Sequence, residues 1–271
     1  HPGSFVLLLL VLVAAVLTVG VLVFLVGYIL IRGIPYLKPS LFAWTYNSDN
    51  VSMLPAMINT LFMTVLALLL SVPFGVGAAI YLVEYAKKGN KLVGLIRVTA
   101  ETLSGIPSII YGLFGMLFFV TALKWGYSMM AGAATLAIMV LPVIMRTTEE
   151  ALLCVPDSFR EGSFGLGAGK LRTIFKIVLP SAIPGILSGI ILAIGRIVGE
   201  TAALIYTSGT VANLAGFFYS GLTLAIHMYS LSREGMHTNE AYATAVVLLI
   251  VVLIINGVSS LIAKKFEAPK Q

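Results

Sequence analysis

The sequence has few charged residues and only one cysteine, and both scarcities restrict what the chain can be. Only 10% of its 271 residues are Asp, Glu, Lys or Arg, against about 25% in an ordinary soluble domain. Hydrophobic residues make up 59% of the chain, which is more apolar surface than a water-soluble fold can bury. Cys154 is the single cysteine, so no disulfide can form within the chain. The composition therefore predicts a membrane protein without a disulfide framework.

The motifs of a nucleotide-binding, metal-binding or nucleic-acid-binding protein are also missing. Gly169-Lys170 resembles the end of the phosphate-binding loop G-x-x-x-x-G-K-[ST], but Phe164 stands at the first glycine position and Leu171 follows the lysine. The three histidines have no ligand-like spacing with carboxylates. The net charge of +6 is ascribed to cytoplasmic loops. We expect no enzymatic chemistry, and no cofactor, metal or nucleic acid bound by this chain.

Six continuous apolar runs approach the length of about 20 residues that crosses a bilayer. The expected spans cover residues 5–31, 56–83, 105–123, 127–145, 182–206 and 241–263. The first is longer than the core of a signal peptide, so we expect it to be a retained span. The sequence predicts an all-α polytopic membrane protein, with six transmembrane helices in one domain of residues 1–271. We expect residues 207–240, whose apolar segment is too short to cross, to form an extracytoplasmic loop or interfacial helix.

Basic residues are distributed unequally between the two sides of this topology. Of 17 Lys and Arg residues, twelve fall on one side and four on the other, and Arg196 lies inside the fifth span. The side richer in basic residues normally faces the cytoplasm. We therefore expect both termini and the loop of residues 147–180 to be cytoplasmic.

The cytoplasmic loop contains the sequence REGSFGLGAGKLRTIFKIVLP at residues 160–180. Pro156 and Asp157 favour the start of a helix, which we expect over residues 158–164. Three glycines then permit a tight turn, namely Gly165, Gly167 and Gly169. Beyond the turn, we expect an amphipathic helix along the membrane surface that ends at Pro180. This pattern fits either a docking surface for a soluble partner or a loop that lies on the membrane.

The spacing in this loop resembles the EAA loop of permease subunits from ATP-binding-cassette (ABC) importers, whose usual form is EAA-x3-G-x9-I-x-L-P. Here the corresponding residues are Glu161-Gly162-Ser163, Gly167 and Ile177-Val178-Leu179-Pro180. The small Gly162 and Ser163 replace the usual alanines. The resemblance implies a coupling helix that sits in a groove on a separate ATPase. The residues it implies for this contact are Arg160, Glu161, Gly162, Ser163 and Gly167.

Three longer segments are similar to the phosphate-specific permeases of the PstA type. They read GIPSIIYGLFG, RTTEEALLCVPDSFREGSFGLGAGK and LAIGRIVGETAALIYTSG. The resemblance implies the type I ABC-importer permease fold and a place in the bacterial inner membrane. The implied importer also contains a homologous second permease, two ATPase subunits that hold ATP and Mg, and an extracytoplasmic phosphate-binding protein. The alternatives are a permease for another oxyanion, such as sulfate or molybdate, and a secondary transporter driven by an ion gradient.

Arg196 with Glu200, and Arg97 with Glu101, are pairs of opposite charges four residues apart. Arg196 and Glu200 lie in the fifth expected span, where an isolated Arg costs about 2.5–3.5 kcal/mol on insertion scales. Positions four apart share a helix face, so we expect Glu200 to pair with Arg196. Because a guanidinium matches phosphate oxygens, we expect Arg196, Glu200 and Thr201 to serve the substrate pathway. The alternative is a structural ion pair that locks this span to the partner permease. Arg97 and Glu101 are expected to form a solvated ion pair.

Overall fold

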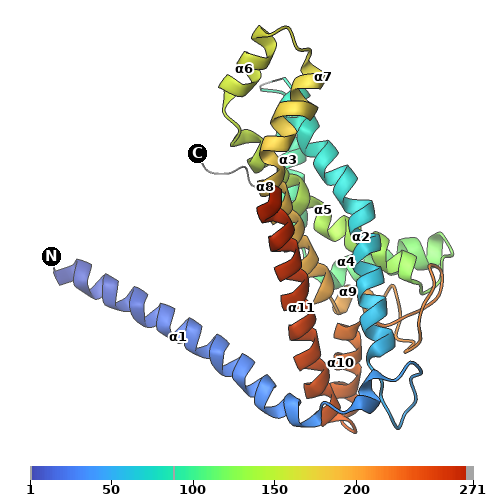
Figure 1. Cartoon of the computed structure of the whole chain (residues 1–271). Helices are drawn as coiled ribbons and strands as arrows, with labels where there is room; N and C mark the ends of the chain where they lie inside the picture. The colour runs from blue at the N-terminus through green and yellow to red at the C-terminus, as the bar shows by residue number, and fades with distance from the viewer. Residues whose placement is uncertain (1, 88, 267–271) are drawn as a thin grey trace.

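The computed structural model describes residues 2–87 and 89–266, and this part of the chain is helical without a β-strand (Figure 1). The longer helices are α1 (Pro2–Gly33), α2 (Leu54–Ile80), α5 (Met129–Leu153), α8 (Leu179–Val198) and α11 (Thr238–Phe266). The shorter helices are α3 (Lys91–Ser104), α4 (Ser108–Gly115), α6 (Asp157–Gly165), α7 (Lys170–Thr173), α9 (Ala202–Ile205) and α10 (Leu224–Glu234). The remaining helical segments are the 3-10 turns η1 (Ile34–Tyr36) and η2 (Pro39–Phe42) and the π-helical segments η3 (Tyr81–Tyr85), η4 (Met116–Ala122) and η5 (Ile174–Val178).

Five helical stretches of the described chain are long and apolar enough to cross a membrane. They are Val6–Tyr36, Leu54–Tyr85, Met129–Leu153, Lys170–Val198 and Thr238–Lys265. A sixth crossing arises if α3 is counted together with α4 and its extension η4. The expected all-α polytopic fold is confirmed, with five single-helix crossings and one bent pair.

The bent pair corrects the straight third span expected over residues 105–123. Its two helices meet at an angle of 101°. Pro107 disfavours a helical conformation for the preceding Ile106, which is why α3 ends at this point. The hydroxyl of Tyr111 donates a 2.7 Å hydrogen bond to the carbonyl of Leu103, so it joins α4 to α3 across the corner.

Two further helix boundaries differ from expectation around the loop expected over residues 147–180. Helix α5 continues to Leu153, so the loop expected over residues 147–180 begins inside a helix. The expectation that a surface helix ends at Pro180 is also wrong, because α7, η5 and α8 form one continuous helical stretch, Lys170–Val198. Pro180 lies inside this stretch, although proline lacks an N–H and its ring clashes with the preceding helical turn. The widened π-helical turn of η5 lies directly before α8, at the position of this clash.

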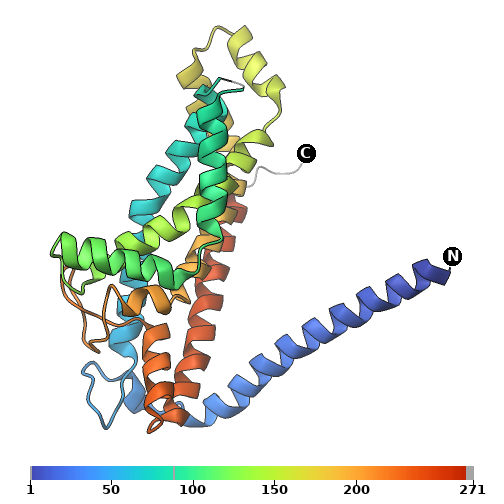
Figure 2. The same cartoon turned by 180° about the vertical axis from the view of Figure 1, so that it is seen from behind.

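The helices α2, α5, α8 and α11 form the body of the molecule, in which each packs against the next (Figure 1). Helix α1 leaves this body at a wide angle, as both views show (Figure 2). The C-terminal end of α1 meets α11, and a side chain at Gly33 would collide there with the backbone of Tyr242. The apolar side chains described along the rest of α1 are largely exposed, so that lipid or another membrane protein must cover them.

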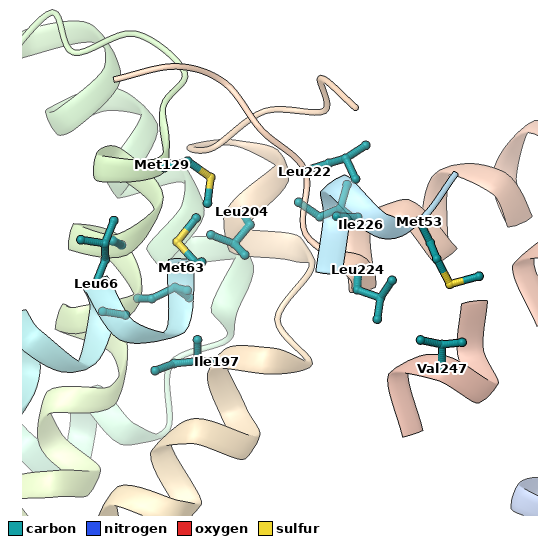
Figure 3. Packing of buried hydrophobic residues seen from close by; sticks show 14 of the residues in the cluster. Met53, Met63, Leu66, Met129, Ile197, Leu204, Leu222, Leu224, Ile226 and Val247 are labelled. Atoms are coloured by element: carbon teal, nitrogen blue, oxygen red, sulfur yellow. The ribbon is translucent and has the colours of Figure 1, made fainter. Parts of the chain in front are cut away.

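Two hydrophobic clusters hold the body together. In the larger cluster, Met63 of α2, Met129 of α5 and Leu204 of α9 lie close together (Figure 3). The smaller cluster lies next to the loop that contains α6 and consists of Ala79, Leu82, Val93, Met145, Leu152, Val155, Val178, Ala182 and Ile186. The segment expected as an extracytoplasmic loop, residues 207–240, contains the helix α10, which packs against α11.

Helices α4 and α9 approach so closely at Gly112 that a Cβ there would lie 2.7 Å from the Cα of Ala203. We predict that Gly112→Ala destabilises the protein by about 1–3 kcal/mol, because backbone atoms must shift to admit the methyl group. Gly77→Ala is the matched control, since Gly77 lies in α2 with open space at its Cβ position. Thermal unfolding of the purified chain in detergent measures the difference, and equal midpoints for the two variants would contradict this packing.

Candidate coupling loop and substrate pathway

Helix α6 lies at the end of the molecule that carries the EAA-like motif. It begins at Asp157 after Pro156 and ends at Gly165, so the short helix expected over residues 158–164 is confirmed. Gly167 then adopts φ +80°, a backbone conformation that strongly favours glycine. The chain therefore turns sharply after α6 and enters α7, as expected from the glycine spacing.

Arg160 points into the protein, and its side chain is 14% exposed. Its Nε and Nη2 donate to Oε1 of Glu84 at 3.1 and 2.7 Å. Nη2 also donates to the carbonyl of Leu152, and Nη1 donates to the carbonyl of Val155 and to Oδ1 of Asp157. All five N–H donors of the guanidinium are thus engaged within the chain. Arg160 is consequently occupied by internal contacts, although the motif placed it among residues for an ATPase contact.

The other motif residues divide into one internal contact and an exposed surface. Ser163 is the buried residue of α6, and its hydroxyl lies 2.8 Å from that of Thr173 in α7. Glu161 and Gly162 are exposed, and nothing lies within 4 Å of a Cβ placed at Gly162. Three exposed apolar side chains accompany them, namely Phe159, Phe164 and Leu166. These three were not predicted as functional, although apolar residues in a surface loop are themselves a signal of a docking surface.

The fifth crossing is interrupted near Arg196 and Glu200, the two charged residues expected inside the membrane. Helix α8 ends at Val198, Gly199 follows as its C-cap, and a new helix begins at Ala202. Oε1 of Glu200 accepts a 3.0 Å hydrogen bond from the backbone N–H of Ala203. The continuous span expected over residues 182–206 is therefore wrong. Glu200 caps the first turn of α9, where a carboxylate is also favoured by the helix dipole.

Arg196 has no ion-pair partner among the described residues, so the expected pair with Glu200 is not formed. The spacing of four residues brings side chains together only on a continuous helix, and α8 ends between them. Arg196 is half-buried in the last turn of α8, and a positive charge is favoured near the carbonyl end of a helix. Its charge lies within electrostatic reach of Tyr111 in α4. Thr201 is the N-cap residue of α9 and is half-buried beside this break.

The expected pair of Arg97 and Glu101 is also replaced by another arrangement. Arg97 of α3 forms its ion pair with Glu149 of α5, because α3 packs along α5. Next to it, Arg146 pairs with the exposed Glu150 one turn further along α5 at 3.2 Å. These charges line a cavity of about 550 Å³ between the two helices.

The fold and the arrangement of the loop define a class of membrane transport permease. Residues 71–268 match the family described as "Binding-protein-dependent transport system inner membrane component", and the chain belongs to this family. It is 35% identical over 278 residues to a probable ABC transporter permease protein YqgI from Bacillus subtilis, with 94% of each chain covered. It is 37% identical over 211 residues to the phosphate transport system permease protein PstA 1 of Mycobacterium tuberculosis, covering 76% of this chain and 69% of the relative.

A solved structure supports the same fold. A chain of a bacterial ABC transporter involved in the import of the acidic polysaccharide alginate superimposes with a TM-score of 0.70 at 16% identity. The match covers 95% of this chain and 96% of the other. The fold is therefore that of the type I ABC-importer permeases.

The positive φ of Gly167 leads to a test of the loop. We predict that Gly167→Val strains the turn by about 1–3 kcal/mol, because a β-branched residue is disfavoured at φ +80°. Transport should fall, and ATP hydrolysis by the assembled transporter should lose its response to the binding protein. Gly169→Val is the matched control, since Gly169 is extended at φ −71° and ψ 159° and has open space at its Cβ. Unchanged transport and stimulation in Gly167→Val would show that the turn has no role in coupling.

Proposed function

We propose that this chain is the membrane permease subunit of an ATP-driven importer of inorganic phosphate. The observation that carries the proposal is Arg196, a guanidinium without an ion-pair partner in the described chain, at a helix break between two membrane-embedded segments. Relatives at 32–37% identity are named as phosphate transport permeases, which favours phosphate as the solute.

The helix break provides a chemical rationale for weak and reversible anion binding. The planar guanidinium of Arg196 presents paired N–H donors to phosphate oxygens. The carbonyl end of α8 partly offsets its positive charge, which suits a site that must release its ion. Glu200 caps the N-terminus of α9, so this helix end is closed to a second anion contact. Thr201 adds a hydroxyl at the same break.

The partners follow from the surfaces that the chain leaves uncovered. The exposed side of α6, with Phe159, Phe164 and Leu166, supports docking to an ATPase subunit that holds ATP and Mg. In this proposal two such ATPases serve this chain and a homologous second permease. An extracytoplasmic phosphate-binding protein delivers the ion. The importer lies in the bacterial inner membrane with both termini of this chain in the cytoplasm, as the basic residues indicate.

Two other functions remain as alternatives, each with a distinguishing feature. A permease for sulfate or molybdate would keep the fold and the coupling loop and would be expected to differ in its membrane charges, and solute competition separates it from the phosphate importer. A secondary transporter would have no use for the exposed apolar side chains of Phe159, Phe164 and Leu166 in and directly after α6, which carries the first residues of the EAA-like motif. The coupling loop therefore favours an ATP-driven transporter.

We predict that Arg196→Gln lowers phosphate uptake by about 10–100-fold in the assembled transporter, because charge-assisted hydrogen bonds contribute about 1.5–3 kcal/mol. Arg196→Lys should be intermediate, since it keeps the charge and loses the planar fork. Glu200→Gln is the control and should keep phosphate uptake, because the amide oxygen of Gln can still accept the hydrogen bond from the N–H of Ala203. Uptake is measured with radiolabelled phosphate after assembly has been verified by co-purification. Full uptake by assembled Arg196→Gln would remove Arg196 from the pathway.

A further inference from the structure

The coupling helix α6 is joined to the membrane-spanning body through a small number of described contacts. Within α6 itself only Ser163 is buried, and its hydroxyl meets Thr173 at the start of the continuous stretch Lys170–Val198. The second contact is the guanidinium of Arg160, which reaches Glu84 in η3 at the end of α2. A displacement of α6 can therefore act on α8 through Ser163 and on α2 through Glu84, besides α5, whose Leu152 carbonyl also accepts a bond from Arg160.

The ion pair of Arg160 and Glu84 is buried, and its burial determines whether the pair separates or moves as a unit when α6 is displaced. The side chain of Glu84 is 8% exposed and that of Arg160 is 14% exposed. Separating the pair would leave the carboxylate of Glu84 without its charged partner in a largely buried environment, and Arg160 would lose the two bonds that it donates to Glu84. Removing one partner of a buried ion pair is strongly unfavourable. An exposed pair would separate at little cost because water replaces the lost partner. The buried pair instead favours joint movement of α6 and the end of α2.

The two stretches that α6 contacts through Arg160 and Ser163 each contain a π-helical segment. Glu84 lies in the π-helical η3, and the stretch that receives Ser163 contains the π-helical η5. Short π-helical segments are rare and often occur at functional sites. A further contact ties the same end of α2 to the loop, because Nζ of Lys170 lies 4.8 Å from the centre of the Tyr85 ring.

We propose that the buried pair of Glu84 and Arg160 transmits the displacement of α6 to α2, which makes Glu84 a positioning residue for coupling although it lies outside the EAA-like loop. The proposal rests on the proposed function, since it requires that an ATPase moves α6. It assigns to Glu84 a role that needs no contact with the ATPase. In this account, α6 moves α8 through Ser163 and Thr173, and it moves α2 through Arg160 and Glu84.

The test uses the complete transporter in vesicles, with Glu84→Gln in this chain. The variant keeps the size of the side chain and one acceptor oxygen but removes the charge. We expect basal ATP hydrolysis to persist, whereas phosphate transported per ATP hydrolysed should fall about tenfold, within the range usual for coupling between sites. Glu84→Asp keeps the charge and shortens the side chain by one methylene, so its ratio should be intermediate. The matched control is Glu150→Gln, which neutralises the exposed pair with Arg146 and should keep the original ratio.

Each result bears on the proposal. An original ratio in assembled Glu84→Gln or Glu84→Asp would overturn it, and so would an equal fall in Glu150→Gln. Failure of both Glu84 variants to assemble, with normal assembly of Glu150→Gln, would make the pair a requirement for folding alone and would also overturn it. The proposed function is tested separately by the unaltered transporter. If that transporter imports another oxyanion, the same ratio is measured with that ion and its binding protein.

Discussion

Every backbone N–H and C=O group at membrane depth must find a partner within the protein, because hydrocarbon offers none. The described chain nevertheless interrupts its helices at Pro107, within the bent pair of α3 and α4, and at Gly199, between α8 and α9. At the first break, the hydroxyl of Tyr111 satisfies a carbonyl at the end of α3. At the second, Glu200 satisfies an N–H of α9. These side chains permit the bends that shape the interior, and the break at Gly199 leaves Arg196 without a described ion-pair partner.

The same requirement explains how the segment beyond α9 is held against the body. Asn59 of α2 donates from Nδ2 to the carbonyls of Asn213 and Leu222, and its Oδ1 accepts the N–H of Ala215. The hydroxyl of the next residue, Thr60, accepts a hydrogen bond from the N–H of Leu224 at the start of α10. Two neighbouring polar residues of a membrane helix thus fix the segment that precedes α10. The position of this segment depends on α2, the helix whose other end carries Glu84.

Features that depend on local sequence could be predicted, whereas those that depend on tertiary contacts could not. Apolar runs predicted the crossings because hydrophobic length is a local property, and the glycine spacing predicted the turn at Gly167. The partner of Arg160 was missed because Glu84 stands 76 positions earlier and meets it only through the packing of α2 beside the loop. The pair of Arg196 and Glu200 was mispredicted because the rule for residues four apart presumes a continuous helix. Gly199, which stands between them, is the local signal of the helix end.

The central claim is that ATP hydrolysis drives phosphate through this permease by moving α6. The most direct measurement is phosphate accumulation by sealed vesicles that contain the complete transporter, with binding protein on one side, ATP on the other and no ion gradient. The account predicts accumulation that requires hydrolysable ATP and persists in an excess of sulfate. Accumulation that needs an ion gradient and proceeds without ATP, or that is abolished by sulfate, would contradict it.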